Sequence, residues 1–196
     1  MKGAIKSLTV DRYLSPIRDQ LIGMVDPGAK VIEFGCGNGD LLCRMAQKIE
    51  IGTGIDSSVP LIDYANKKKQ SQDFSNINFE VKDLCLGYSS EKKYDFAIAS
   101  LLLHVLPMNC SLELLNKMIS ISDAVLICEF SKPENLKQHF LLWLDQRFTP
   151  HYKHFKAFKS SNYSEGIFER ISNITVTTHD TFDPVIKIYE VVSKGS

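Results

Sequence analysis

Three glycines and two acidic residues near the start of the chain have the types and spacing of a small-molecule site. Gly35, Gly37 and Gly39 directly follow an apolar segment, and a glycine turn lets a ligand approach the backbone closely. Asp56 ends a second apolar segment 17 residues beyond Gly39, near the spacing at which a carboxylate meets both hydroxyls of a ribose. Glu33 lies inside the first segment, where a buried acid is costly unless it is paired. The pattern predicts a nucleotide-type ligand.

Each of these features also has a plain structural explanation. The glycines could make only a tight turn, and Asp56 could only cap a helix. Their occurrence in one strand–helix–strand unit favours a ligand. A dinucleotide fingerprint needs a small residue where this chain has Asp40, and we expect that carboxylate to repel a pyrophosphate. An NAD-dependent oxidoreductase is therefore the weaker alternative.

The elements that must position these residues alternate between strand and helix patterns. Short apolar segments predict buried strands at 31–34, 51–55, 77–81, 96–99 and 124–130, with helical patterns between them. This order predicts an α/β fold, a doubly wound and mostly parallel sheet. Two further strands, at 174–178 and 186–192, have no helix between them, so they should form an antiparallel hairpin at the sheet edge.

A chain of 196 residues fits one domain, which we divide into four parts. They are an N-terminal helix in 1–28, a core in 30–130, an insertion in 132–171 and the hairpin in 173–193. The insertion begins with a predicted helix, 132–148, whose large apolar residues at helical spacing more often belong to a core than to a pocket. A polar and aromatic stretch, 149–164, and a short helix near 167–171 follow.

The segment Glu33-Phe34-Gly35-Cys36-Gly37-Asn38-Gly39 resembles motif I of the class I S-adenosylmethionine-dependent methyltransferases. The resemblance covers about residues 30 to 130 and the final hairpin, whose antiparallel last strand is a hallmark of that family. It is closest to the small-molecule branch, including the ubiquinone-biosynthesis-like enzymes. The resemblance implies a seven-stranded Rossmann-like sheet, S-adenosylmethionine as cofactor and methyl transfer to a small molecule by in-line displacement.

The resemblance also implies a role for each residue that follows a strand. Glu33 would lie near the methionine part of the cofactor, and Asp56, with Ser57 beside it, at the ribose. Asp83 would accept from the adenine amino group, Leu84 would offer its backbone N–H, and Ser100 would contact the methionine moiety. The turn beneath the cofactor would consist of Gly35, Cys36, Gly37, Asn38 and Gly39. As plain alternatives, Asp83 is a loop cap and Ser100 a turn residue.

In-line methyl transfer depends mainly on alignment, so a general base is needed only if the acceptor arrives protonated. The candidate bases are His104, His151 and His154. His104 lies on an apolar stretch, where a lone histidine usually has a structural hydrogen bond. His151 and His154 belong to the aromatic stretch, which we expect to form a lid or acceptor wall. The spacing of these residues indicates no metal site.

The composition bounds the possible partners. Basic and acidic residues number 23 each, which disfavours a nucleic-acid partner, and no apolar run is long enough to span a bilayer. The five cysteines form no CxxC pair, so we interpret them as small buried side chains in a reducing compartment, the cytoplasm. We expect a small-molecule acceptor and a monomer or homodimer. A non-catalytic S-adenosylmethionine-binding or partner-binding domain is a further alternative.

Overall fold

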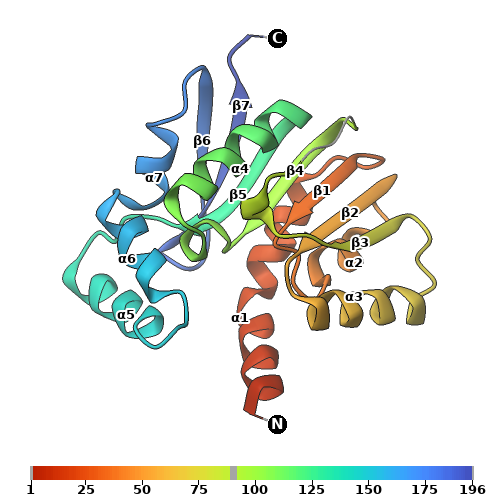
Figure 1. The fold of residues 1–196 in the computed structure, drawn as a ribbon, viewed down its shortest axis with the longest axis horizontal. Helices are drawn as coiled ribbons and strands as arrows, with labels where there is room; N and C mark the ends of the chain where they lie inside the picture. The colour runs from red at the N-terminus through yellow and green to blue at the C-terminus, as the bar shows by residue number, and fades with distance from the viewer. Residues whose placement is uncertain (1, 89–91, 196) are drawn as a thin grey trace.

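The computed structural model describes residues 2–88 and 92–195, and within them the strands form one seven-stranded sheet (Figure 1). The strands follow the apolar segments of the sequence closely, and the central ones are largely buried. Their bounds are β1 (Lys30–Phe34), β2 (Ile51–Asp56), β3 (Ile77–Val81), β4 (Tyr94–Ser100), β5 (Ser122–Phe130), β6 (Ile174–Asp180) and β7 (Ile186–Ser193).

The strand order is β3-β2-β1-β4-β5-β7-β6. The first five strands pair in parallel, whereas β7 is antiparallel to both β5 and β6. This arrangement confirms the predicted doubly wound sheet and its C-terminal hairpin. The order reverses between β1 and β4, which is where ligands bind in open α/β sheets, at the carboxyl ends of the strands.

Helices connect the parallel strands and cover the sheet. The helix α2 (Asp40–Met45) opens directly from the glycine turn, and α3 (Val59–Ser71) follows β2. The helix α4 (Met108–Ile121) packs on β4, β5 and β7 and crosses in front of the sheet in Figure 1. Two short 3₁₀ turns, η1 (Leu84–Leu86) and η2 (Leu103–Val105), follow β3 and β4. They lie at the carboxyl end of the sheet, beside the predicted site.

The N-terminal helix α1 (Lys2–Met24) is longer than its apolar pattern predicts and contains Pro16. The residues of that apolar pattern, Leu14, Ile17 and Leu21, pack into the core. None of the helices in the described part of the chain is both long and apolar enough to cross a bilayer.

The insertion consists of α5 (Leu136–Gln146), α6 (Tyr152–Ser160) and α7 (Tyr163–Phe168), which gather beyond the β5 side of the sheet (Figure 1). The aromatic stretch is largely helical, because Phe155 and Phe158 anchor α6 in the core. Two expectations are wrong in this region. The last short helix begins at Tyr163 rather than near 167. Finally, most of the large apolar side chains from 140 to 148 are exposed rather than in the core, namely Phe140, Leu141, Leu144 and Phe148.

The cysteines depart from the prediction in one respect. Cys36, Cys43 and Cys128 are free and buried, as expected. Cys85 and Cys110, however, form a disulfide that ties η1 to the first turn of α4. The interpretation of all five cysteines as reduced side chains is therefore wrong for this pair, and the cysteines no longer support a reducing compartment. No sequence pattern indicates this disulfide, because the two cysteines are 25 positions apart.

Candidate active site

The turn between β1 and α2 requires glycine for two separate reasons. Gly35, Gly37 and Gly39 all have positive φ angles, of 71°, 53° and 72°. At Gly35 a side chain would lie 2.8 Å from the Cδ1 atom of Leu102, and at Gly39 it would lie 2.6 Å from the ring of Phe79. The turn therefore stays thin, and its backbone lines a cavity at the end of β1.

Glu33 lies in the middle of the sheet at the reversal point, and its side chain is almost completely buried. One carboxylate oxygen, Oε2, has no hydrogen-bond partner among the residues that the structure describes. Burial raises the pKa of Glu33 to about 8, although the nearby positive charge of Arg18 opposes this increase. An incompletely paired buried acid at this position fits the prediction that Glu33 faces a ligand rather than serving the scaffold.

Asp40, at the start of α2, is surrounded by cations. Its carboxylate lies 2.7 Å from the Nζ of Lys68, 3.1 Å from Arg18 and 3.8 Å from Arg44. Burial acts to raise the pKa of Asp40, but these three cations hold it below its ordinary value. Since these cations balance its charge, Asp40 would not repel a pyrophosphate as the sequence predicts.

Asp56 holds the site together from the end of β2. Its Oδ2 accepts a hydrogen bond from the backbone N–H of Gly37 at 2.9 Å, and its Oδ1 accepts from Ser58 at 2.8 Å. The Ser58 side chain makes no cap at the start of α3, and Asp56 fixes the backbone of this N-cap residue instead. Each carboxylate oxygen has a second lone pair that can accept from a ribose hydroxyl.

A cavity of about 240 Å³ brings part of the predicted site together. Six of the predicted residues line it, namely Glu33, Gly35, Cys36, Gly37, Asn38 and Ser100. Five others do not, namely Gly39, Asp56, Ser57, Asp83 and Leu84. Asp56 is attached to the cavity through Gly37, and Asp83 caps η1 by accepting from the N–H of Cys85. The cavity therefore brings together the residues of the β1 turn with Ser100 at the end of β4.

A second cavity, of about 550 Å³, adjoins the first, and Leu14 and Leu101 line both. Leu101 directly follows β4 and has a φ of 51°, an unusual conformation for leucine that often occurs at functional sites. The walls of the second cavity are mostly apolar, with four polar side chains, namely Tyr13, Gln138, Asp145 and Asp183. This arrangement places an apolar chamber next to the end of the first cavity.

Two of the candidate bases, His104 and His151, lie behind the side chains that line this larger cavity. The Nδ1 of His104 lies 2.8 Å from the Oε1 of the fully buried Glu129, and its ring packs against Phe130 and His151. Phe130 lines the larger cavity, whereas His104, His151 and His154 line neither of the two cavities. Burial, followed by the charge of His104, lowers the pKa of His151. The aromatic stretch is a packed layer behind the chamber rather than its wall.

The sequence reasoning missed Arg18, Leu101 and Glu129. Arg18 follows Leu14 by one helical turn and so lies beside the apolar stripe of α1, a position at which a charged residue indicates a use inside the fold. Glu129 could have been found in the same way as Glu33, because it is an acidic residue within a buried apolar strand. No pattern in the sequence marks Leu101, because its role comes from backbone geometry. Among the described residues, no cluster of three or more side chains could hold a metal ion.

Comparisons with known proteins agree with this geometry. A family model described as a methyltransferase domain matches residues 25–181. The ubiquinone biosynthesis O-methyltransferase of Coxiella burnetii is 32% identical over 80 residues, which are 41% of this chain and 34% of that protein. The match therefore spans only about a third of the relative's length. These matches give no support to the dehydrogenase alternative.

Solved structures share the fold over most of the chain. The magnesium protoporphyrin IX methyltransferase of Synechocystis, with bound S-adenosylhomocysteine, has a TM-score of 0.58 at 20% identity, covering 94% of this chain and 80% of that one. An N-methyltransferase from Bradyrhizobium japonicum has a TM-score of 0.64 at 14% identity, covering 95% of this chain and 97% of that one. At these identities the likeness shows the fold.

Proposed function

Because the chain belongs to the methyltransferase domain family, we propose that it transfers a methyl group from S-adenosylmethionine to a small, largely apolar acceptor. The cofactor, when bound, supplies a methyl group on a positively charged sulfur. The smaller cavity would hold its methionine end, and the larger cavity would hold the acceptor. Leu14 and Leu101, which line both cavities, mark where the two molecules would meet.

The observation that carries this proposal is the charge pattern of the smaller cavity. Arg18 and Glu33 line it together, and one oxygen of Glu33 has no hydrogen-bond partner within the described part of the chain. The methionine end of the cofactor carries an ammonium and a carboxylate on the same carbon atom. We propose that Glu33 accepts from the ammonium and that the guanidinium of Arg18 donates to the carboxylate, because a zwitterion in this orientation satisfies both groups.

The remaining cofactor residues follow from the strand ends. Asp56 would accept from the ribose hydroxyls, with Ser57 exposed beside it, while continuing to hold the N–H of Gly37. Asp83 and Leu84 follow the neighbouring strand β3 and would receive the adenine ring. Asp83 is exposed and its Oδ1 already accepts from Cys85, so its Oδ2 would accept from the adenine amino group.

We propose that alignment, rather than a fixed base, supplies most of the catalysis. His104 is buried and bound to Glu129, and we assign it a positioning role in holding the segment after β4, which includes Leu101. His151, which directly precedes α6, packs on His104 and supports the same segment. An acceptor in the larger cavity would contact mostly aliphatic side chains, which favours an apolar molecule.

Further proposals concern partners and location. We propose a monomer or homodimer that methylates no nucleic acid. The balanced charge supports the exclusion of nucleic acid, since no excess of cations is available to neutralise a phosphate backbone. The disulfide between Cys85 and Cys110 counts against a reducing compartment.

A labelling screen tests the proposed function. The chain would be incubated with S-adenosylmethionine labelled in its methyl carbon and with fractions of a cell extract separated by polarity. We expect the label to enter molecules of the apolar, low-molecular-weight fractions. If no fraction takes up label while the cofactor binds, the chain is a non-catalytic cofactor-binding domain. If only nucleic acid or protein is labelled, the small-molecule proposal is wrong.

A further inference from the structure

Helix α5 carries an exposed apolar stripe that the proposed reaction does not explain. Leu136, Phe140 and Leu144 are 86%, 57% and 44% exposed, and Phe148, in the turn after the helix, is 78% exposed. These residues are four positions apart and so lie along one side of the helix. A contiguous apolar surface of this kind usually marks an interaction site. We refer to these four residues as the α5 stripe.

The opposite side of α5 forms part of the proposed acceptor cavity. Gln138, Leu141, Leu142 and Asp145 line that cavity, and Leu142 is buried. Leu141 is unusual because it lines the cavity and is also 52% exposed. The exposed apolar surface is therefore continuous with the rim of the cavity. A surface that merely stabilised the fold would not need this continuity.

The charge around the α5 stripe differs from that of the whole chain. The segment from 132 to 160 has two acidic residues, Glu134 and Asp145, against six basic ones, namely Lys132, Lys137, Arg147, Lys153, Lys156 and Lys159. These six basic side chains are all exposed. The chain as a whole has a formal net charge of zero, so the positive charge is local. Exposed apolar residues flanked by cations fit a partner that has an apolar interior beneath a negatively charged surface, as an anionic lipid bilayer has.

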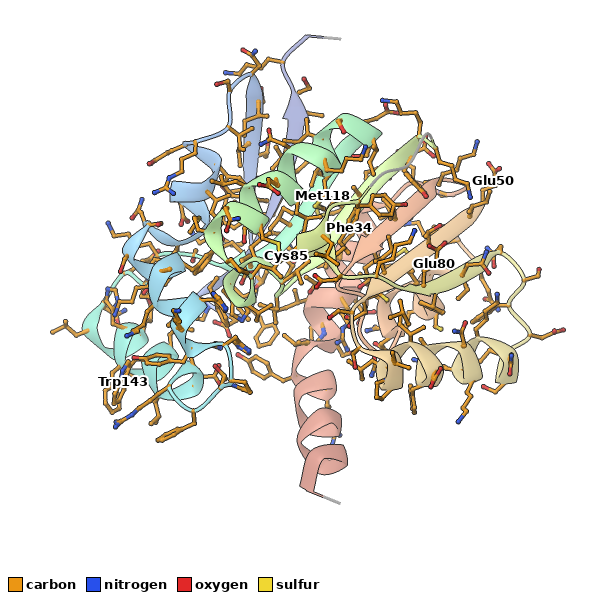
Figure 2. The ribbon with its side chains drawn as sticks, in the orientation of Figure 1. Phe34, Glu50, Glu80, Cys85, Met118 and Trp143 are labelled. Carbon is orange, nitrogen blue, oxygen red and sulfur yellow. A yellow bond between two sulfur atoms is a disulfide. The ribbon has the colours of Figure 1, made fainter. Side chains whose placement is uncertain are left out.

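Aromatic residues at the edge of the stripe are also amphipathic. Trp143, labelled at the outer edge of the molecule in Figure 2, donates its indole N–H to the hydroxyl of Tyr152 at 3.1 Å. The guanidinium of Arg147 lies 4.7 Å from the Trp143 ring and 5.4 Å from the Phe148 ring. Tryptophan and tyrosine with neighbouring cations are typical of the boundary between lipid and water.

We propose that the α5 stripe and the surrounding cations bind the surface of an anionic lipid bilayer, with α5 lying in the plane of the headgroups. The bound surface would bring the mouth of the larger cavity to the lipid, and this consequence alone rests on the proposed function. A second copy of the chain fits less well, since a symmetric contact would set the same basic patches against each other.

Vesicle sedimentation of the whole chain tests this proposal without any activity measurement. The expected result is sedimentation with vesicles of phosphatidylcholine and phosphatidylglycerol, weaker sedimentation with phosphatidylcholine alone, and release by added salt. The double variant Phe140→Ser and Phe148→Ser should bind at least roughly tenfold more weakly. The matched control is Tyr64→Ser, because Tyr64 is 57% exposed, like Phe140, but lies on α3 at the opposite side of the molecule (Figure 1).

A second double variant, Lys153→Glu and Lys156→Glu, tests the charge separately and should lose the preference for anionic vesicles. Binding of S-adenosylhomocysteine confirms that each variant is folded, since none of these residues lines the smaller cavity. Two results would overturn the proposal. One is that the chain sediments with neither vesicle, or equally well after the phenylalanine substitutions. The other is a dimer in solution that those substitutions dissociate, in the absence of vesicle binding, which would make the α5 stripe a contact between copies.

Discussion

The imidazole Nδ1 of His104 lies 2.8 Å from the Oε1 of Glu129, and both side chains are almost completely excluded from water. Glu129 also accepts the backbone N–H groups of His104 and Phe130, at 3.3 and 2.9 Å. One carboxylate thus fixes the end of β5 and the turn after β4. The pair connects the two strand ends that border the proposed reaction site.

Replacing Glu129 with Ala should therefore lower the free energy of unfolding by about 3 kcal/mol, because it leaves buried donors without a partner. Denaturant unfolding measures this change. The matched control is Glu190→Ala, which removes the partner of His179 in a pair 3.4 Å apart at the surface. That variant should change stability by less than about 1 kcal/mol. Equal effects of the two substitutions would show that Glu129 anchors nothing.

The buried Glu33 should make the stability of the free chain depend on pH. Burial raises its pKa from 4.5 to about 8, so between these values the folded chain holds a proton that the unfolded chain releases. Stability should therefore be greatest at the acidic end of this window and decrease as the pH rises through about 8. Thermal unfolding across the window should show a steeper decrease for the wild type than for Glu33→Gln. Parallel curves would place Glu33 at an ordinary pKa.

Gly39, in the glycine turn, should not tolerate an added methyl group, whereas Gly28, which precedes β1, should tolerate one far better. Gly28 and Gly39 have similar φ angles, of 79° and 72°, but an added Cβ meets nothing within 4 Å at Gly28 and lies 2.6 Å from Phe79 at Gly39. Gly28→Ala should cost about 1 kcal/mol for its backbone conformation. Gly39→Ala should cost about 2 kcal/mol more, because the strand and helix must move apart. Similar unfolding free energies for the two variants would contradict the close packing at Gly39.

The fold was predictable because it depends on local patterns. Apolar segments of strand length, separated by helical patterns, specify a buried parallel sheet, and the lack of a helix after residue 178 specifies the hairpin. The turn and Asp56 were predictable for the same reason, since a strand end and a helix start are adjacent in sequence. The fit to motif I then supplied the roles of Glu33 and Ser100.

What the sequence could not provide are relationships between distant segments. Arg18 on α1 contacts Asp40 on α2, and Glu129 on β5 contacts His104, which follows the neighbouring strand β4. Neither pair therefore has a recognisable spacing in the sequence. The apolar residues of α5 have the spacing of a core helix, and only the tertiary structure shows that most of them face water. An apolar pattern specifies that a helix is amphipathic but not what covers its apolar side.

The disulfide between Cys85 and Cys110 should contribute measurably to stability. It closes a chain segment of 25 residues, and a loop of that length corresponds to about 3 kcal/mol in the chain-entropy account. A reductant should lower the unfolding free energy of the wild type by about 3 kcal/mol and leave that of the Cys85→Ser variant unchanged. A reductant that affects both proteins equally, or neither, would show that the bond does not form in solution.

The central claim is that the site at the ends of β1 and β2 binds S-adenosylmethionine through Asp56, and calorimetric titration with S-adenosylhomocysteine tests it most directly. The wild type should bind this product but not NAD, and Asp56→Ala should weaken binding by roughly 1.5 to 3 kcal/mol. The control is Asp95→Ala, since Asp95 also accepts a backbone N–H, that of Lys30, but at the opposite end of the sheet. Its affinity should equal that of the wild type. An Asp56→Ala protein that binds as tightly as the wild type, or a wild type that binds NAD instead, would contradict the account.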